Sequence, residues 1–348
     1  MRRLPTQADV AERAGVSRAL VSMALSGRPE VAASTRELIL RASQDVGYRV
    51  NAPAANLARR RTNLLGVILQ DVANPFFSEV AAHVQDAATA AGLTTLLNDG
   101  RRDAAREAYA VEVFLQLRVD GLVIVSPLQK GAALSTIGSQ VPTVVVGYPV
   151  LAQEVDFVHN DSAAGARTAT EHLIALGHRD IAYLDVAGEP EPLLLDRRAG
   201  YLAAMRDAGL GGRARVFADI AADGDAADLV LALSRRPTAL LAHNDVSAVA
   251  AMGVLSRAGI DVPREISVVG YDNTRLAAMP QFDLTTVDQP RAPTGKAAFA
   301  LLSERMLGRE PGRTVRLAPH LVVRGSTAPP REARQVRPPA HRPHGNRD

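Results

Sequence analysis

The residues of this chain best placed to do chemistry lie at the start of a short predicted helix near the N-terminus. Ser17 can cap that helix, and Arg18, Ala19 and Ser22 follow in its first turns. An arginine and small hydroxyl side chains in this position can hydrogen-bond to base edges in the major groove of DNA. Leu20 stands among them and either reaches a thymine methyl group or packs inward.

Three predicted helices position these residues. The first spans 6–15, where a hydroxyl cap precedes an acid by three residues and a glycine ends the helix. The second spans 17–27, and the third follows a Ser34-x-x-Glu37 capping box and runs to residue 47. Two short helices joined by a tight turn, with a third to support them, predict a helix-turn-helix. The alternative is any other small helical bundle.

The charge is divided unevenly along the 348 residues. Residues 1–62 carry a net +6, residues 63–328 a net −6, and residues 329–348 a net +3. A basic head on an acidic body is typical of a polyanion-binding module joined to a unit with another task, which favours DNA binding by the head. The tail 329–348 is rich in Pro and Arg, and we expect it to be disordered.

The head resembles that of the LacI/GalR family of bacterial transcription regulators. The run from Asp9 to Gly27, and then Val31 and Gly47-Tyr48, match the family spacing without a gap. Three residues depart from the family pattern on its reading face, which affects the choice of operator: Leu20, Met23 and Ser26. The resemblance implies DNA contacts from seven residues of the head: Thr6, Ser17, Arg18, Ala19, Leu20, Ser22 and Met23.

Residues 51–62 follow the head and could form one or two helical turns. A helix this short is marginal alone and needs something to fold against. The resemblance implies a hinge helix that begins near Asn51, pairs with its dimer mate in the minor groove and inserts Leu57 between base pairs, with Arg59 placed for phosphates. The alternative is a solvated, Arg-rich linker.

Beyond residue 63, short β-branched runs alternate with Ala-rich amphipathic stretches. The predicted strands are 64–69, 93–97, 121–125, 143–147, 180–184, 238–242 and 266–270. The predicted helices are 77–91, 103–117, 162–176, 195–208, 225–234 and 245–258. The alternation predicts an α/β body of parallel sheets with helices on both faces.

This body is longer than one such sheet usually needs, so we expect two doubly wound subdomains. Resemblance to the LacI/GalR effector domain, and through it to periplasmic sugar-binding proteins, implies three crossings between them. We therefore expect the following organisation: a helix-turn-helix head over 1–50, a hinge over 51–62, and an effector-binding and dimerisation domain over 63–328, whose N-subdomain takes about 63–160 plus 292–320 and whose C-subdomain takes about 161–290 plus 321–328.

Ligands of open α/β sheets bind beyond the carboxyl ends of the strands. Loops in such places hold Phe76, Phe77, Asn244 and Asp272, and the family resemblance adds Arg197. The arginine could donate to vicinal hydroxyls, the asparagine and aspartate could accept from them, and a phenylalanine could stack on a sugar or base. Each also has a plain structural interpretation: the phenylalanines as core, the arginine as a surface ion pair, the aspartate as a turn-forming cap.

Some positions in this part depart from the sugar-binding members of the family. Gly147 stands where many have an acid, Ile220 stands near a usual aromatic, and 189–195 is unusually apolar. Each change removes a polar or stacking contact. We therefore expect an effector that is less hydroxylated, or bulkier, than a simple hexose.

An enzyme is the main alternative for the body. The chain has no dinucleotide, P-loop, nucleophile-elbow or H-E-x-x-H motif. It has no cysteine, and its histidines at 159, 172, 178 and 243 lack metal-ligand spacing, so we expect loop or cap histidines, no metal and no cofactor. Without a long apolar span or an apolar leader, we expect a cytoplasmic protein with no membrane partner rather than a secreted solute-binding protein.

Together these features predict a DNA-binding transcription regulator, a repressor or alternatively an activator of the same fold. We expect a homodimer on a near-palindromic operator, because two heads related by a twofold axis read related half-sites. A small sugar-like or other metabolite between the subdomains is expected to control operator affinity through the hinge helices.

Overall fold

The computed structural model of the chain describes residues 3, 5–26, 28–49, 61–150, 152–186, 191–220 and 236–331. It divides into two compact units, Met1–Asn63 and Leu64–Asp348. The predicted hinge residues Asn51, Leu57 and Arg59 lie outside the described residues, as do the predicted helix 225–234 and most of the predicted disordered tail.

The first unit contains α1 (Gln7–Ala14), α2 (Arg18–Leu25) and α3 (Ala33–Val46). The Asp9 carboxylate accepts hydrogen bonds from both the backbone N–H and the hydroxyl of Thr6, and Gly15 ends α1 in the left-handed conformation. The hydroxyl of Ser17 accepts from the Leu20 N–H at the start of α2, at 3.2 Å. The predicted caps of both helices are thus confirmed.

The start predicted for the third helix is wrong. α3 begins at Ala33 and has no side-chain cap, so Ser34 lies inside its first turn. Glu37 pairs with Arg41 one turn later instead of reaching back to the helix start. Arg36 secures this end of the helix, since it donates to the backbone carbonyls of Ala24 and Arg28. These contacts join α3 to the end of α2.

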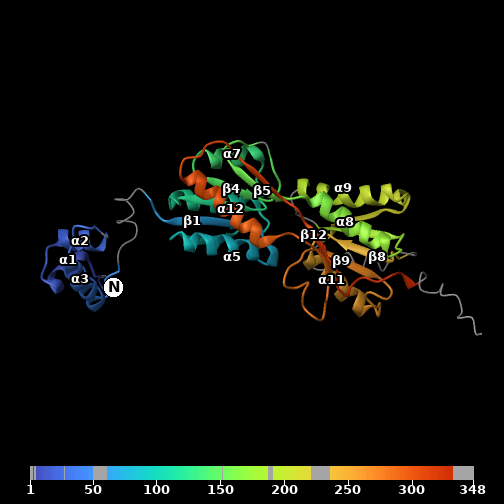
Figure 1. Ribbon diagram of the computed structural model, residues 1–348, viewed down its shortest axis with the longest axis horizontal. Helices are drawn as coiled ribbons and strands as arrows, with labels where there is room; N and C mark the ends of the chain where they lie inside the picture. The colour runs from blue at the N-terminus through green and yellow to red at the C-terminus, as the bar shows by residue number, and fades with distance from the viewer. Residues whose placement is uncertain are drawn as a thin grey trace, which may run out of the picture. The chain divides into compact units, whose positions relative to one another are not determined.

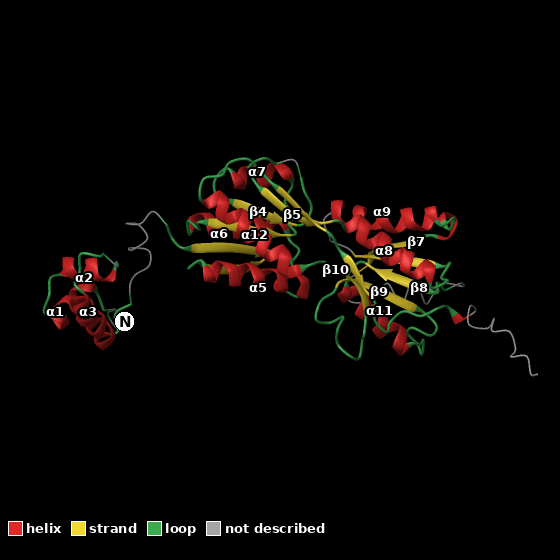
Figure 2. Ribbon diagram, viewed as in Figure 1, coloured by secondary structure: helices red, strands yellow, loops and turns green. Residues whose placement is uncertain are grey.

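The second unit contains two six-stranded sheets (Figure 1, Figure 2). The first sheet runs, in order, β11 (Thr314–Leu317), β5 (Asp156–Asn160), β4 (Thr143–Val146), β3 (Gly121–Val125), β1 (Leu64–Leu69) and β2 (Thr94–Asp99). The second runs β12 (His320–Val322), β10 (Thr285–Asp288), β9 (Ser267–Asp272), β8 (Ala239–Ala242), β6 (Ile181–Val186) and β7 (Arg215–Ile220). All seven predicted strands are confirmed.

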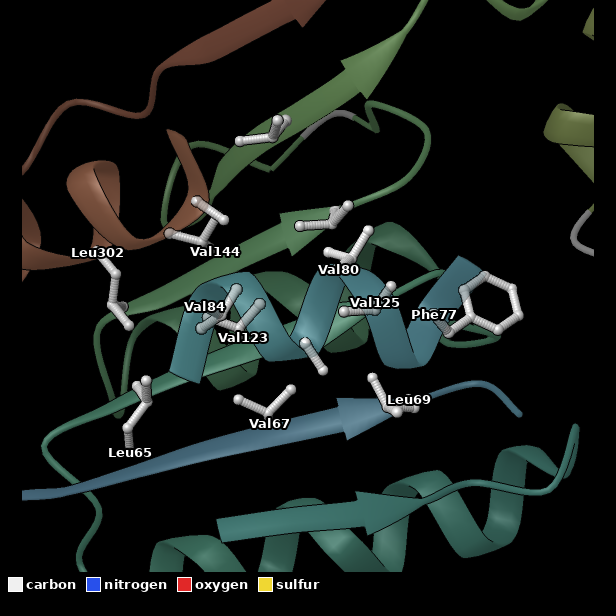
Figure 3. Packing of buried hydrophobic residues seen from close by; sticks show 14 of the residues in the cluster. Leu65, Val67, Leu69, Phe77, Val80, Val84, Val123, Val125, Val144 and Leu302 are labelled. Carbon is white, nitrogen blue, oxygen red and sulfur yellow. The ribbon is translucent and has the colours of Figure 1, made fainter. Parts of the chain in front are cut away.

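Helices cover both faces of the first sheet. On one face, α5 (Pro75–Ala90) and α12 (Arg291–Met306) pack on alternate residues of the strands (Figure 3). On the other face, α6 (Ala104–Gln116) and α7 (Gly131–Gly138) cover the residues between them. Because both faces are buried there, the inner strands β1, β3 and β4 are nearly continuously apolar, as sequence patterning predicted.

The second sheet is covered in the same way. α8 (Ser162–Ala175) and α9 (Glu191–Asp207) lie on one face, and α11 (Asp245–Arg257) lies on the other. A 3-10 turn over Gly211–Arg213 precedes β7. The described part of the body thus holds two doubly wound sheets.

The chain passes between the two sheets three times. It leaves the first sheet after Asn160, returns between β10 and α12, and crosses again between β11 and β12. β10 ends at a crossover whereas β12 begins at one, and these neighbours are antiparallel. The expectation of purely parallel sheets is therefore corrected at this edge, while the other strand pairs of the described residues are parallel.

Candidate functional site

A cleft lies where strands of both sheets end. It has about 490 Å³ of empty space, which includes the part open to solvent. All five residues predicted to contact an effector line it. The lining residues are Asn74, Phe76, Phe77, Val125, Ser126, Val146, Gly147, Asn160, Ser162, Arg197, His243, Asn244, Asp272 and Gln289.

The first turn of α5 brings two aromatic rings to the cleft. Asn74 caps the helix by accepting from the Phe76 N–H at 3.0 Å, and Pro75 occupies its first turn. The rings of Phe76 and Phe77 meet edge to face, 5.7 Å between centroids. Both are buried in the core of the first sheet, and Figure 3 shows Phe77 at the end of α5 beyond Leu69. The core and cleft interpretations of these residues therefore both hold.

Arg197 lies on α9 and is 97% buried, so it is not a surface ion pair. Its Nη1 donates to the backbone carbonyl of His243 at 2.6 Å. The guanidinium stacks 3.9 Å from the centroid of the Tyr271 ring, and Nη2 lies 3.8 Å from Oδ1 of Asp272. Its Nε has no hydrogen-bond partner among the described residues. The side chain is thus held at the cleft with its Nε unused.

Asp272 ends β9 and is held by hydrogen bonds from the crossovers. Gln289 donates from Nε2 to its Oδ1 at 2.6 Å and accepts from Nδ2 of Asn160 at 3.0 Å. Asn160 and Gln289 stand at the first and second crossovers. The polar wall of the cleft therefore continues into the connections between the sheets, a role that was not predicted for Gln289.

Asn244 is present in the cleft, but its predicted chemistry is partly wrong. It caps α11, and its Oδ1 accepts from both the backbone N–H and the hydroxyl of Ser247, each at 2.8 Å. The carbonyl oxygen that was expected to accept from a ligand is committed to the helix. Only the amide nitrogen of this side chain can serve a ligand.

His243 lines the cleft, although the sequence analysis predicted only a loop or cap histidine there. It is buried and contacts the Tyr183 hydroxyl through Nδ1, at 3.2 Å, and Nη1 of Arg197 through Nε2, at 3.3 Å. Burial and the nearby Arg197 charge hold the pKa of His243 well below its ordinary value. The ring is therefore neutral, with Nε2 as acceptor. His178 is also buried and bonded to Thr238. Both histidines lie in loops, as predicted, but these loops are buried.

Gly147 explains one departure from the family pattern. Its φ of +152° belongs to a region that side chains rarely adopt, so an acid would be strained there. Across the strand end, Ser126 has a buried hydroxyl with no partner among the described residues. The side chains of Ile220 and of residues 191–195, also expected to shape the cleft, lie outside the described part.

In the first unit, the predicted reading residues lie on the exposed side of α2. Arg18, Ala19, Ser22 and Met23 are exposed, whereas Leu20 is half-buried against the core of the unit. Of the two alternatives for Leu20, inward packing describes the structure. Thr6 is exposed at the cap of α1.

Comparison with known proteins agrees with both units. Residues 6–51 match the profile of the bacterial regulatory proteins of the lacI family, and residues 170–327 match that of the periplasmic binding protein-like domain. The chain therefore belongs to the lacI family of bacterial regulatory proteins. Among the described residues, no helix is long and apolar enough to cross a membrane, and no cluster of three or more acidic or histidine side chains could hold a metal ion.

Particular relatives are similar over nearly their whole length. The transcriptional repressor CytR of Escherichia coli K12 is 32% identical over 92% of this chain and 96% of its own. The repressor PurR of Vibrio campbellii is 33% identical over 93% and 98%. The lac repressor dimer bound to operator and the anti-inducer ONPF superposes with a TM-score of 0.79 at 27% identity, covering 94% of this chain and all of that one. The two relatives are repressors and not enzymes.

Proposed function

We propose that this protein is a transcriptional repressor that binds operator DNA as a homodimer and changes its operator affinity when an uncharged small molecule enters the cleft. The observation that carries the proposal is the buried, opposed pair of Arg197 and Asp272 in a cleft between two sheets, in a chain that also bears a helix-turn-helix. A ligand that binds one conformation of such a cleft more tightly shifts the body toward that conformation, which is how it would control operator affinity.

The DNA contacts come from the exposed face of α2. Arg18 and Ser22 supply hydrogen bonds to base edges, and Ala19 and Met23 lie beside them. Leu20 supports the helix from the core side. Asn51, Leu57 and Arg59 are proposed to serve as a hinge in the minor groove, in line with the family resemblance.

The lining of the cleft describes the effector. The walls from the first sheet are mainly apolar, with Phe76, Phe77, Val125, Val146 and Gly147. The walls from the second sheet are all polar. Arg197 and Asp272 balance in charge and His243 is neutral, so a charged ligand would gain no net counter-charge. A neutral ring compound with one flat apolar part and one hydroxyl-bearing part fits this division, as in nucleosides and aryl glycosides.

Three unused polar atoms mark where such a ligand would bond. The hydroxyl of Ser126, Oδ1 of Asn160 and Nε of Arg197 are buried without partners among the described residues. Unpaired buried groups of this kind cost about 1–3 kcal/mol each, which a ligand would recover. The effector would accept from the arginine and donate to the asparagine.

The dimer surface is proposed on α5 and β2. β2 is an edge strand of the first sheet, and Val72 and Leu97 are 54% and 52% exposed beside it. A groove there is also lined by Leu69 of β1 and by Ala81 and other residues of α5. An edge strand with exposed apolar side chains needs cover, and a second copy supplies it with twofold symmetry. Because the two heads of such a dimer are related by a twofold axis, the operator should be nearly palindromic.

The test is a gel shift on the chain's own promoter with a panel of compounds. Adenosine and a nitrophenyl glucoside represent the two sources of a flat ring, with glucose and adenosine monophosphate as the polar and charged comparisons. We expect one of the first two to change operator affinity at least tenfold more than the comparisons do. A response to glucose or to the nucleotide alone would contradict the proposed effector, and no shift of DNA would contradict the proposed function.

A further inference from the structure

The turn that follows β9 connects the cleft to the opposite subdomain. Asp272 lines the cleft, and the next residue, Asn273, accepts and donates several hydrogen bonds. Both residues have positive φ, +111° and +52°. Two successive residues in this region of backbone space persist only where contacts on every side hold them.

Two charged residues of the first subdomain hold this turn from outside. Glu79 of α5 accepts from the backbone N–H of Arg275 through Oε1, at 3.3 Å. Arg291, the first residue of α12, donates from Nη1 to the backbone carbonyl of Asn273. The same Nη1 lies 2.9 Å from Oε2 of Glu79. One ion pair thus bonds to both ends of the segment 273–275.

The ion pair is built from helices of one subdomain and bonds to the backbone of the other. α5 and α12 pack side by side on the first sheet (Figure 1), whereas the turn leaves β9 of the second. The side chains of Glu79 and Arg291 are only 16% and 20% exposed. A partly buried pair is screened less by salt than a surface pair. The side chain of Arg275 is 89% exposed, and its Nε lies 3.9 Å from Oε1 of Glu79, so it adds little to this ion pair.

We propose that Glu79 and Arg291 form a latch that holds the segment 273–275 against the first subdomain and so sets how firmly the cleft is closed. Glu79 and Arg291 do not line the cleft. They are positioning residues, which act on a ligand through Asp272, the residue that begins the turn. α5 also carries Phe76 and Phe77, so the latch ties both walls of the cleft together. Its effect on an effector rests on the proposed function, but the latch itself does not.

Two neighbouring amides provide a direct test without ligand or DNA. The Arg275 N–H bonds across the subdomains to Glu79, whereas the Thr274 N–H bonds within its own subdomain to Asp245, at 2.7 Å. Glu79→Gln keeps an oxygen acceptor but removes the charge that Arg291 pairs with. We expect amide exchange, measured by NMR on the full chain, to become about tenfold faster at Arg275 and to stay unchanged at Thr274.

Asp86→Asn is the matched control, because it removes the same charge from an exposed position of α5 and should change neither amide. Arg291→Gln should match Glu79→Gln, and the double variant should exceed either by less than the sum, since both residues act in one network. Unchanged exchange at Arg275, or equal acceleration at both amides, would overturn the latch, the second because it means that the turn unfolds as a whole.

A distance measurement between the two subdomains can monitor the opening of the cleft. The chain has no cysteine, so Glu112→Cys on α6 and Ser256→Cys on α11, both exposed, place one spin label on each subdomain. We expect Glu79→Gln to add longer distances to the distribution and Asp86→Asn to leave it unchanged. Faster exchange at Arg275 with an unchanged distribution would overturn the claim that the latch holds the subdomains together. Failure of the operator gel shift would leave both readouts intact.

Discussion

Removing the Arg197 side chain should destabilise the second unit, because it takes a positive charge away from the buried carboxylate of Asp272. Both side chains are less than 5% exposed, and the pair is 3.8 Å apart. Breaking a buried pair by deleting one partner costs about 3–5 kcal/mol, and the hydrogen bond from Gln289 offsets part of this. We expect Arg197→Ala to lose about 3 kcal/mol, which is about 6–12 °C of melting temperature for a unit of this size.

The double variant Arg197→Ala with Asp272→Asn isolates the charge. Asparagine is close in shape to aspartate and tolerates the positive φ at this position, so it removes the negative charge and little else. Thermal unfolding followed by circular dichroism should show that the double variant recovers at least half of the loss. Equal melting temperatures for the single and double variants would refute the reasoning, because the loss would then come from the contacts with His243 and Tyr271.

Arg197→Ala should affect operator binding and stability differently, and the stability of the second unit should depend on pH. Arg197→Ala below its melting temperature should still shift operator DNA in a gel but lose the effector response; loss of the shift would mean that the residue is structural. The depressed pKa of His243 means that the unfolded chain takes up its proton first, so the second unit should lose stability as pH falls below about 6.5, by up to about 1.4 kcal/mol per pH unit. His243→Gln should flatten this dependence of stability on pH in urea unfolding curves measured between pH 7 and 5.5. The variant must be compared with the parent at each pH, because Asp245, with its pKa raised to about 6, changes stability in the opposite sense. An unchanged slope would contradict the assignment. In the first unit, Ile39→Ala should cost about 2–5 kcal/mol because the side chain is fully buried, and operator binding should fall while the melting of the second unit, followed by circular dichroism, stays constant.

Prediction succeeded where a feature depends on neighbouring residues. The caps of α1 and α2 involve residues three apart, and the predicted strands other than β2 are mainly runs of buried apolar residues. It missed β5, β7, β10, β11 and β12, of which β11 and β12 are short edge strands with only partly buried residues. It also failed at Ser34, where a motif of suitable spacing lies inside a helix that starts one residue earlier.

The cleft shows the same division between local and distant causes. Phe76, Phe77, Arg197, Asn244 and Asp272 follow strands or belong to a motif, and all of them line it. Their bonding could not be predicted, because the oxygen of Asn244 serves its own helix and the partners of Arg197 come from other strands. The missed residues Gln289 and Asn160 are 129 residues apart in the chain and meet only because two crossovers lie together.

By itself, the sequence determined the helix-turn-helix with its capped reading helix, the alternation of strands and helices in the body, and the family. The helices and strands depend on the spacing of apolar residues at 2 to 4 positions, and the family depends on a motif of consecutive residues. Only the tertiary structure decided that His243 is neutral, that Asn244 has one usable group, and that Glu79 and Arg291 grip the turn after Asp272. The physical reason is that burial, charge pairing and free hydrogen-bonding capacity are set by neighbours in space, which the packing of the two sheets selects.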